Sequence, residues 1–338
     1  MTNISLNFEP VSPDKKRLRQ IFVSCIRGSA IGDALGMPFE NLPETKIKEN
    51  FHLPLNSYFD PIEGAPCYEF GLKKGMYTDD TQSARACTIG IAKHRHLTLS
   101  IIADALYGWL FRNSLKQEPR YPGITTREAM IRYHKHGDPN KCGVDSATCG
   151  AAIRIAPVAL WFCVRRPRDI DSEIRKVACI THTANSAQDG AVIVAHLIQH
   201  SVKGGAIGFS DLYSRCTSKL MFKALQGVHR ALESNTSCDE VAQELGGGTK
   251  AHAVIPMAIY HLFKCQFRFN DSLRNALNTF HPSGLDMDSI LSVCGAIAGA
   301  HFAEEVEQSE WIEGLEDCKK IAREAQDLFK IATDSLEA

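Results

Sequence analysis

The sequence lacks any apolar run long enough to cross a membrane, and residues 1–20 lack the apolar core of a signal peptide. It also lacks an excess of charge of either sign, because 38 Lys and Arg against 39 Asp and Glu leave a formal net charge of −1 at pH 7. This balance argues against a general nucleic-acid-binding protein. We therefore expect a globular cytoplasmic protein that binds neither a membrane nor a nucleic acid.

Cysteine is present, but not in the pairs that disulfide frameworks or zinc sites use. The 12 cysteines are scattered over 338 residues, and no Cys-x-x-Cys pair occurs. Several of them, such as Cys25, Cys163 and Cys294, lie in apolar segments with helical spacing. In a chain of this length the pattern predicts buried free thiols in a reducing compartment.

The sequence also has no sustained alternation of apolar and polar residues, no internal repeat and no linker. We expect one all-α domain over residues 14–338, made of many helices and preceded by a flexible leader over residues 1–13. Residues 41–74 contain several Pro and Gly, which predict a long irregular loop that covers the functional site of the protein. Apolar spacing of three and four residues predicts helices that include about 79–96, 100–113, 124–136, 187–200, 250–264, 290–303 and 316–336.

Two carboxylates and a hydroxyl stand at the start of the predicted helix at 290–303. Asp286, Asp288 and Ser289 follow a turn that contains Pro and Gly. Acidic residues at a helix start can be simple caps. Buried carboxylates this close together repel one another unless a cation lies between them. A cap and a hard-metal site are therefore both open interpretations of this segment.

A second cluster of oxygen donors lies far upstream, where Thr78, Asp79 and Asp80 precede another predicted helix. Oxygen donors without His or Cys suit Mg²⁺ or Mn²⁺ better than Zn²⁺. Two such clusters that meet in the fold would form a two-metal centre.

Together the two segments resemble the metal-binding signatures of the ADP-ribosylglycohydrolase family, which includes the dinitrogenase reductase-activating glycohydrolase. The resemblance extends from about Arg19 to about Glu305, and the two motifs together are specific. It implies an all-α fold and a metal-dependent hydrolase that removes ADP-ribose from modified protein side chains. It also implies two Mg²⁺ or Mn²⁺ ions, bridged by Asp288 and held by Thr78, Asp79, Asp80, Asp286, Asp288 and Ser289.

Three glycines of an early predicted helix, Gly28, Gly32 and Gly36, recur every four residues. Because glycine weakens an isolated helix, this spacing predicts very close contact with another helix. Asp33 lies among these glycines, where an unpaired buried carboxylate would be costly. The segment is similar to the first conserved block of the family.

The acid that handles the proton during hydrolysis remains open among three residues. Glu40 follows the first block, at the place where the family carries a glutamate near the metals. Without the resemblance, Glu40 is better interpreted as a solvated loop acid. The resemblance makes Glu40, Asp79 and Asp33 the catalytic candidates.

A turn of small residues, Cys149-Gly150-Ala151, leads into a further helix. Its backbone amides could bind an anion, and a plain helix cap explains it equally well. The turn is similar to the family block beside bound ADP-ribose, which implies backbone contacts from Gly150 and Ala151, although Cys149 stands where the family usually has Asn. Thr181-His182 resembles a family Thr-His pair, which implies that His182 lines the ADP-ribose pocket, although such a His is usually a cap.

The amino-acid sequences of the early motifs are more similar to those of the arginine-type bacterial members of the family than to those of the serine-type members. Guanidine leaves more easily once it is protonated, and a carboxylate such as Glu40 or Asp33 would hold that cation. We therefore expect a monomer that acts on ADP-ribosyl-arginine in a modified protein and releases ADP-ribose. The alternatives are a serine- or other O-linked ADP-ribose hydrolase, hydrolysis of another nucleotide or glycoside, and a non-catalytic ADP-ribose-binding relative, which the departures Cys149 and Leu285 favour.

Overall fold

The computed structural model describes residues 4–8 and 14–334. The first α-helices are α1 (Lys15–Gly36), α2 (Glu44–Asn50), α3 (Pro66–Glu69), α4 (Asp79–His94), α5 (Leu99–Arg112) and α6 (Ile124–His136). The next are α7 (Gly150–Ile153), α8 (Ala156–Val164), α9 (Ile170–Cys179), α10 (Asn185–Lys203), α11 (Phe209–Tyr213), α12 (Lys219–Glu233) and α13 (Cys238–Leu245). The last are α14 (Ala251–Lys264), α15 (Phe269–Leu277), α16 (Met287–His301), α17 (Ala303–Gln308) and α18 (Cys318–Thr333). Two 3₁₀ turns, η1 (Met37–Phe39) and η2 (Glu310–Ile312), and strands β1 (Ser5–Phe8) and β2 (Gly205–Gly208) are the remaining elements.

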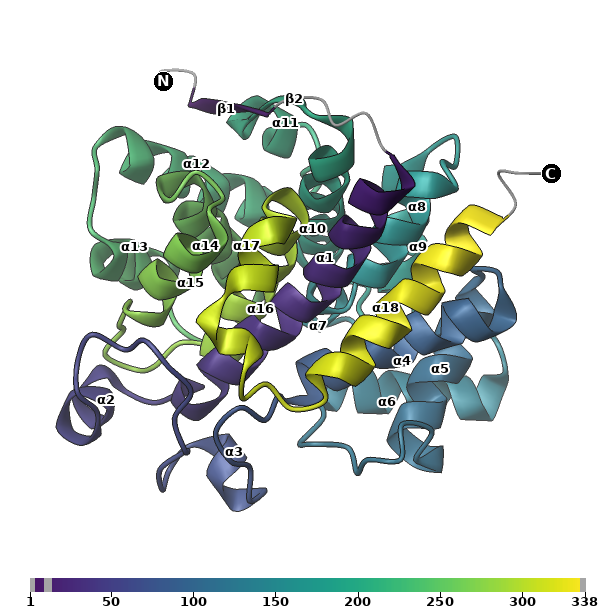
Figure 1. Ribbon diagram of the computed structural model, residues 1–338, viewed down its shortest axis with the longest axis horizontal. Coiled ribbons are helices and arrows are strands. Elements are labelled where there is room, and N and C mark those ends of the chain that lie inside the picture. The colour runs from purple at the N-terminus through teal and green to yellow at the C-terminus, as the bar shows by residue number, and fades with distance from the viewer. Residues whose placement is uncertain (1–3, 9–13, 335–338) are drawn as a thin grey trace.

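Helices α1 and α16 lie side by side in the middle of the molecule (Figure 1). Glycine allows this contact: a Cβ atom on Gly32 would lie 2.0 Å from the carbonyl oxygen of Leu291. A Cβ on Gly28 would lie 2.3 Å from the carbonyl oxygen of Gly295. The close helix contact predicted from the glycine spacing is therefore confirmed.

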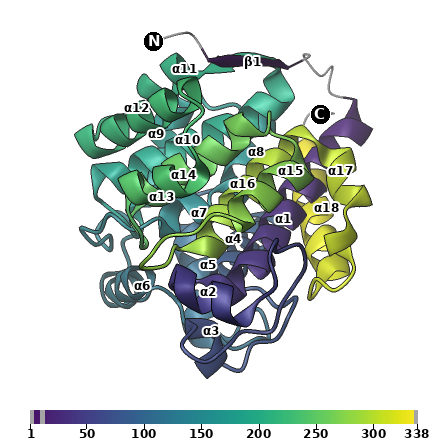
Figure 2. The same ribbon diagram turned by 90° about the vertical axis from the view of Figure 1, so that its left-hand side faces the viewer.

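The direction of the central pair decides where its polar ends meet. Gly28 faces Gly295, while Gly36 faces the backbone of Asp288, so the two helices run antiparallel. The end of α1 therefore meets the start of α16. Helices α4, α10, α14 and α18 pack around the pair, as the turned view shows (Figure 2).

The predicted helices over 79–96, 100–113 and 124–136 are confirmed as α4, α5 and α6. Residues 41–74 hold two short helices, α2 and α3, so this segment is less irregular than expected. Of the predicted leader, residues 1–3 and 9–13 lie outside the described residues. Residues 5–8 form β1, which pairs antiparallel with β2, with Ser5 opposite Gly208, because the extended chain finds backbone partners there.

The all-α fold is confirmed, since the described residues contain only this two-stranded sheet beside the helices. Among these residues, no helix has both the length and the apolar character that crossing a bilayer requires. The 12 cysteines are free thiols, and Cys25, Cys163 and Cys294 are buried.

Candidate metal centre

The start of α4 is held in place by a buried carboxylate on α1. Asp33 is fully buried, and its two oxygens accept hydrogen bonds from the backbone N–H of Thr78 at 2.9 and 3.1 Å. The Thr81 N–H and hydroxyl donate to Asp33 at 2.9 and 2.6 Å. Asp33 therefore meets the orphan donors of a helix N-terminus and fixes α4 against α1.

Glu40 reaches the same region because its segment pairs with the turn before α16. Glu40 forms an isolated bridge with Leu285, and the Asn41 N–H donates to the Leu285 carbonyl at 2.7 Å. Gly284 has a φ of +86°, and a Cβ there would lie 2.5 Å from the Asn41 carbonyl carbon. Glycine is therefore required at this turn, which brings Glu40 beside the start of α16.

Three carboxylates, from Glu40, Asp286 and Asp288, converge at this point. Each offers an oxygen atom, and these atoms all lie within 4.8 Å of one another. Oδ1 of Asp288 and Oε2 of Glu40 are buried and have no hydrogen-bond partner among the described residues. Buried polar atoms without partners are rare, and oxygen atoms so arranged fit a hard divalent cation.

The two predicted ligand clusters meet across the interface of α4 and α16. The Ser289 hydroxyl donates to Oδ2 of Asp80 at 2.9 Å. Oγ1 of Thr78 caps α4 by accepting from the Asp80 N–H at 3.2 Å, and Oδ2 of Asp79 accepts from the Gly123 N–H at 3.1 Å. The fold therefore brings together the oxygen-rich segments that the sequence separates by about two hundred residues.

Burial dominates the electrostatics of this cluster. Burial raises the pKa of Asp79 to about 7. It also raises the pKa of Asp80, Asp288 and Glu40 well above the ordinary range, with further raising by neighbouring carboxylates. Among the described residues no Lys, Arg or His forms an ion pair with these acids, so the charge balance of the site must come from protons or bound cations.

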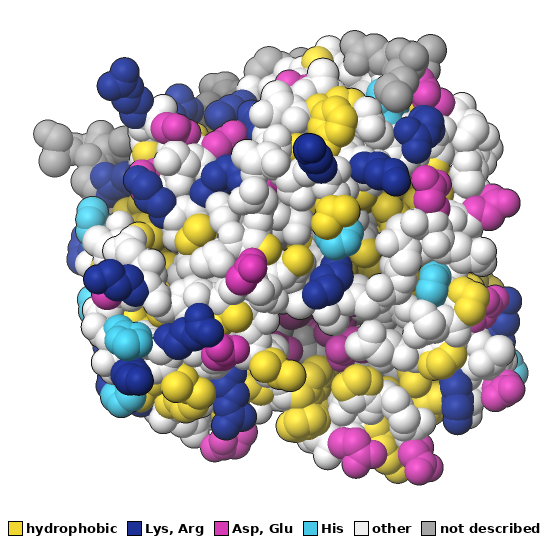
Figure 3. Space-filling model, turned by 180° about the vertical axis from the view of Figure 1, so that it is seen from behind, with side chains coloured by type: hydrophobic (Ala, Val, Ile, Leu, Met, Phe, Trp, Pro, Cys, Tyr) yellow, Lys and Arg dark blue, Asp and Glu magenta, His cyan; other side chains and the backbone are white. Residues whose placement is uncertain are grey.

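A cavity of about 450 Å³ lies over the carboxylates and is large enough for a small-molecule substrate. Figure 3 shows acidic side chains recessed in a hollow on the face opposite to that of Figure 1. Asp33, Thr78 and Ala151 are buried outside this lining. Of the residues predicted from the sequence, the lining includes Glu40, Asp79, Asp80, Gly150, His182, Asp286, Asp288 and Ser289.

Comparison with known proteins identifies the group to which the chain belongs. The family model described as ADP-ribosylglycohydrolase matches residues 14–337. The chain belongs to the ADP-ribosylglycohydrolase family. This is a family of glycohydrolases that release ADP-ribose from ADP-ribosylated substrates, so the resemblance inferred from the motifs is confirmed.

Relatives of this family member span nearly its whole length. The ADP-ribosylarginine hydrolase Tri1 of Serratia proteamaculans is 26% identical, over 91% of this chain and 78% of its own. The ADP-ribosylhydrolase ARH3 of Gallus gallus is 24% identical, over 91% of this chain and 93% of its own. A solved structure, an ADP-ribosylglycohydrolase-related protein complex, is 21% identical with a TM-score of 0.70, over 94% of this chain and 99% of that chain. It shows the same fold.

In this member of the family, the turn at Gly150 rests on the His182 ring. Nε2 of His182 lies 2.8 Å from the Thr148 hydroxyl, and Nδ1 lies 2.8 Å from the Thr181 hydroxyl. Burial, with a smaller effect from Arg154, lowers the pKa of His182, so the ring is neutral. Arg154 donates to the Gly150 carbonyl at 2.7 Å. The neutral imidazole and the guanidinium together fix the turn that lines the cavity.

The sequence interpretation missed Tyr121, which lies in the loop between α5 and α6. Tyr121 has a φ of +34°, a strained value for a residue with a side chain. Its neighbour Arg120 anchors the loop through Glu316, with contacts of 2.6 and 2.8 Å. The Tyr121 hydroxyl is buried near Glu40, with no hydrogen-bond partner of normal geometry among the described residues. Pro119, Pro122 and Gly123 indicated a loop, but not its contact with a glutamate eighty residues away.

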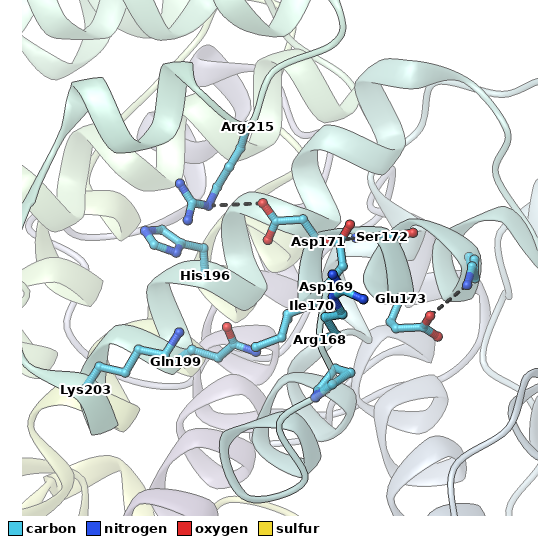
Figure 4. A pocket seen from close by; sticks show the side chains of 12 residues that line it. Arg168, Asp169, Ile170, Asp171, Ser172, Glu173, His196, Gln199, Lys203 and Arg215 are labelled. Atoms are coloured by element: carbon cyan, nitrogen blue, oxygen red, sulfur yellow. Dashed lines mark hydrogen bonds and ion pairs between the residues drawn. The ribbon is translucent and has the colours of Figure 1, made fainter.

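A larger cavity of about 730 Å³ lies between α9 and α10 and contains none of the predicted site residues. Figure 4 shows Arg215 reaching toward Asp171, at 3.6 Å. Glu173 contacts Lys176 at 2.7 Å, and Asp169 accepts from the Ser172 N–H at 3.0 Å as the cap of α9. Its acids therefore have partners within the protein, unlike those of the carboxylate cluster.

Proposed function

We propose that this protein is a metal-dependent hydrolase that removes ADP-ribose from ADP-ribosylated arginine side chains. The observation that carries the proposal is the cluster of Glu40, Asp286 and Asp288, with its unpartnered buried oxygens at the base of a cavity. Such a cluster suits a cation-assisted reaction at a sugar. Two relatives, the ADP-ribosylarginine hydrolase Tri1 and the ADP-ribosylhydrolase ARH3, support the substrate class.

The proposed ligands of two Mg²⁺ or Mn²⁺ ions are Thr78, Asp79, Asp80, Asp286, Asp288 and Ser289. Bound there, the ions would orient the ribose hydroxyls and withdraw electrons from the anomeric carbon. Asp33 takes a positioning role in this proposal, because its oxygens are occupied by Thr78 and Thr81.

Glu40 is our candidate for the acid that moves the proton. Its Oε2 is buried without a partner, and burial together with the neighbouring carboxylates raises its pKa, which favours the protonated form that a proton donor needs. Glu40 gives this proton to the leaving nitrogen of the guanidine as the bond to the anomeric carbon breaks. A water molecule then forms the new bond to that carbon and returns a proton to Glu40.

We propose that the backbone of Gly150 contacts the substrate. We also propose that the His182 ring, which packs against Gly150, lines the substrate pocket. A Cβ on Gly150 would lie 3.2 Å from Cε1 of His182, so a larger residue would press against the ring. Ala151 is buried behind Gly150 and is left with a backbone contribution only.

The preference for arginine rests on charge. The guanidine leaving group is a cation when protonated, and the cavity wall around Glu40 is acidic. A serine linkage carries no such charge and gains less from this environment. Release rates from arginine- and serine-modified peptides by the same preparation compare the two, and faster release from serine would overturn the preference but not the hydrolase.

The proposal is tested by ADP-ribose release from a modified protein, with Mg²⁺, with Mn²⁺ and with a chelator. Release that needs the metal is expected, and Glu40→Gln should slow it by about 100-fold or more. Glu128→Gln changes an exposed glutamate on α6 and serves as the matched control. No release at high enzyme concentration with metal present would overturn the proposal. ADP-ribose binding without turnover would instead place the chain among non-catalytic relatives.

A further inference from the structure

Cys149 places a sulfur atom against the carboxylate cluster. Its Sγ lies 3.2 Å from Oδ2 of Asp286 and 3.7 Å from Oγ of Ser289. Cys149 is 4% exposed and lines the same cavity as Asp80 and Asp288. The thiol thus contacts two of the residues that the proposed function assigns to a cation.

The backbone holds this thiol where it is. The Cys149 N–H donates to the Thr249 carbonyl at 2.9 Å. The Cys149 carbonyl accepts from the N–H groups of Ala152 and Ile153, at 2.8 and 3.3 Å, as α7 begins. With donor and acceptor both engaged, the backbone of Cys149 is fixed at the start of α7.

An independent observation indicates that a ligand belongs here. Asp288 is 3% exposed, and its Oδ1 has no hydrogen-bond partner among the described residues. Asp288 belongs to the cluster of three carboxylates that also includes Asp286, and the thiol contacts Asp286. Asp286 is therefore the link between the two features: its Oδ2 contacts the thiol, and it also offers an oxygen to the cluster with Glu40 and Asp288.

We propose that Cys149 is a ligand of the cation held by Asp286 and Ser289, which makes this half of the centre a mixed sulfur and oxygen site for thiophilic divalent cations such as Zn²⁺, Co²⁺ and Cd²⁺. Thiolate favours these ions, whereas Mg²⁺ prefers oxygen donors and water. As the metal–sulfur bond forms, the S–H proton passes to the buffer, and no electron is transferred. The inference rests on the cation site of the proposed function.

The site has a functional consequence for the enzyme. A thiophilic cation bound through Cys149 and Asp286 occupies the position that the proposed reaction reserves for Mg²⁺ or Mn²⁺. Zn²⁺ or Cd²⁺ should therefore displace Mn²⁺ from half of the centre, and the loss of Mn²⁺ binding should depend on the sulfur.

The test is a Cd²⁺ titration of the full-length protein without substrate, followed by the ultraviolet absorption of the cadmium–thiolate bond. We expect a saturable band that disappears in Cys149→Ser, with Cd²⁺ affinity lowered by about 100-fold. Asp286→Asn keeps the thiol but removes its carboxylate neighbour, and should weaken the band as well. Circular dichroism and the melting temperature establish that each variant is folded.

Cys265→Ser is the matched control, because Cys265 is a partly buried thiol near Cys238 and Asp271 that could bind Cd²⁺ adventitiously. This variant should keep the band. A band unchanged in Cys149→Ser would overturn the inference. Mn²⁺ binding, measured by electron paramagnetic resonance, distinguishes failure of the Cys149 inference from failure of the proposed cation site. If the wild type binds Mn²⁺ but gives no cadmium–thiolate band, only the role of Cys149 is refuted. Wild type that binds neither ion refutes the cation site of the proposed function too.

Discussion

Helix α4 carries two buried charged clusters that are balanced in opposite ways. Near its middle, Arg85 is fully buried and pairs with Glu324 at 2.7 Å and with Asp317 at 3.1 Å. At its start, Asp80 lies near the carboxylates of Asp79, Asp33 and Asp286, with no basic side chain as an ion-pair partner in the part of the chain that the structure describes.

The two clusters illustrate two different consequences of burying charged side chains. A buried ion pair that is complete within the protein favours one folded arrangement. Removing either partner leaves the other as an uncompensated buried charge. Like charges gathered without a counter-ion work against folding until something neutralises them. The Arg85 cluster should therefore govern stability, and the carboxylate cluster should govern activity.

The largest expected effect is on activity, in Asp288→Asn. Removing the charge of the carboxylate with the unpartnered oxygen should lower ADP-ribose release by about 1000-fold or more. The metal-free variant should melt at the same or a higher temperature than the metal-free wild type, because one repelling charge is gone. Release assays and thermal unfolding of the same preparations give both values. A variant that loses its stability together with its activity would contradict the comparison.

The opposite result is expected at Glu324→Ala. Leaving Arg85 with one carboxylate should lower the free energy of unfolding by about 3 kcal/mol, while activity per folded molecule stays unchanged. Urea unfolding measures the loss. Glu128→Ala breaks the exposed pair with Arg132 and should cost about 0.5 kcal/mol or less. Equal losses in the two variants would show that burial of the ion pair makes no difference.

Metal binding should stabilise only one of the two clusters. With free Mg²⁺ or Mn²⁺ at about 100 times its dissociation constant, the wild type should gain about 2.7 kcal/mol for each site. Glu324→Ala should show the same gain, and Asp288→Asn much less. Thermal unfolding with and without a chelator checks this, and a gain retained in Asp288→Asn would place the cation elsewhere.

The smallest effect is expected at the edge of the acidic cluster, in Tyr121→Phe. Loss of the hydroxyl beside Glu40 should lower kcat by about tenfold and leave KM nearly unchanged, because the hydroxyl tunes the proton-carrying group rather than binding substrate. Tyr133→Phe is the control, since that hydroxyl contacts Asp104 away from the cavity. A change in KM alone would give Tyr121 a role in binding instead.

The fold class, the central helix contact and the two acidic segments were all predictable from the sequence alone. These features depend on local order: apolar residues at three- and four-residue steps, glycines every four residues, and carboxylates beside helix starts. Each is visible in a short window of the chain, and the two motifs together were specific enough to identify the family.

Long-range packing determines which hydrogen-bond partners each acid has, and the sequence did not reveal them. From the sequence, Asp33 and Glu40 were equally good catalytic candidates. In the structure, the oxygens of Asp33 accept hydrogen bonds from Thr78 and Thr81, whereas Oε2 of Glu40 has no hydrogen-bond partner among the described residues. Cys149 and Tyr121 were placed against the cluster by turns whose partners lie far away in the chain. Hydrogen-bond satisfaction depends on which groups long-range packing brings within about 3 Å, and no short window of sequence contains that information.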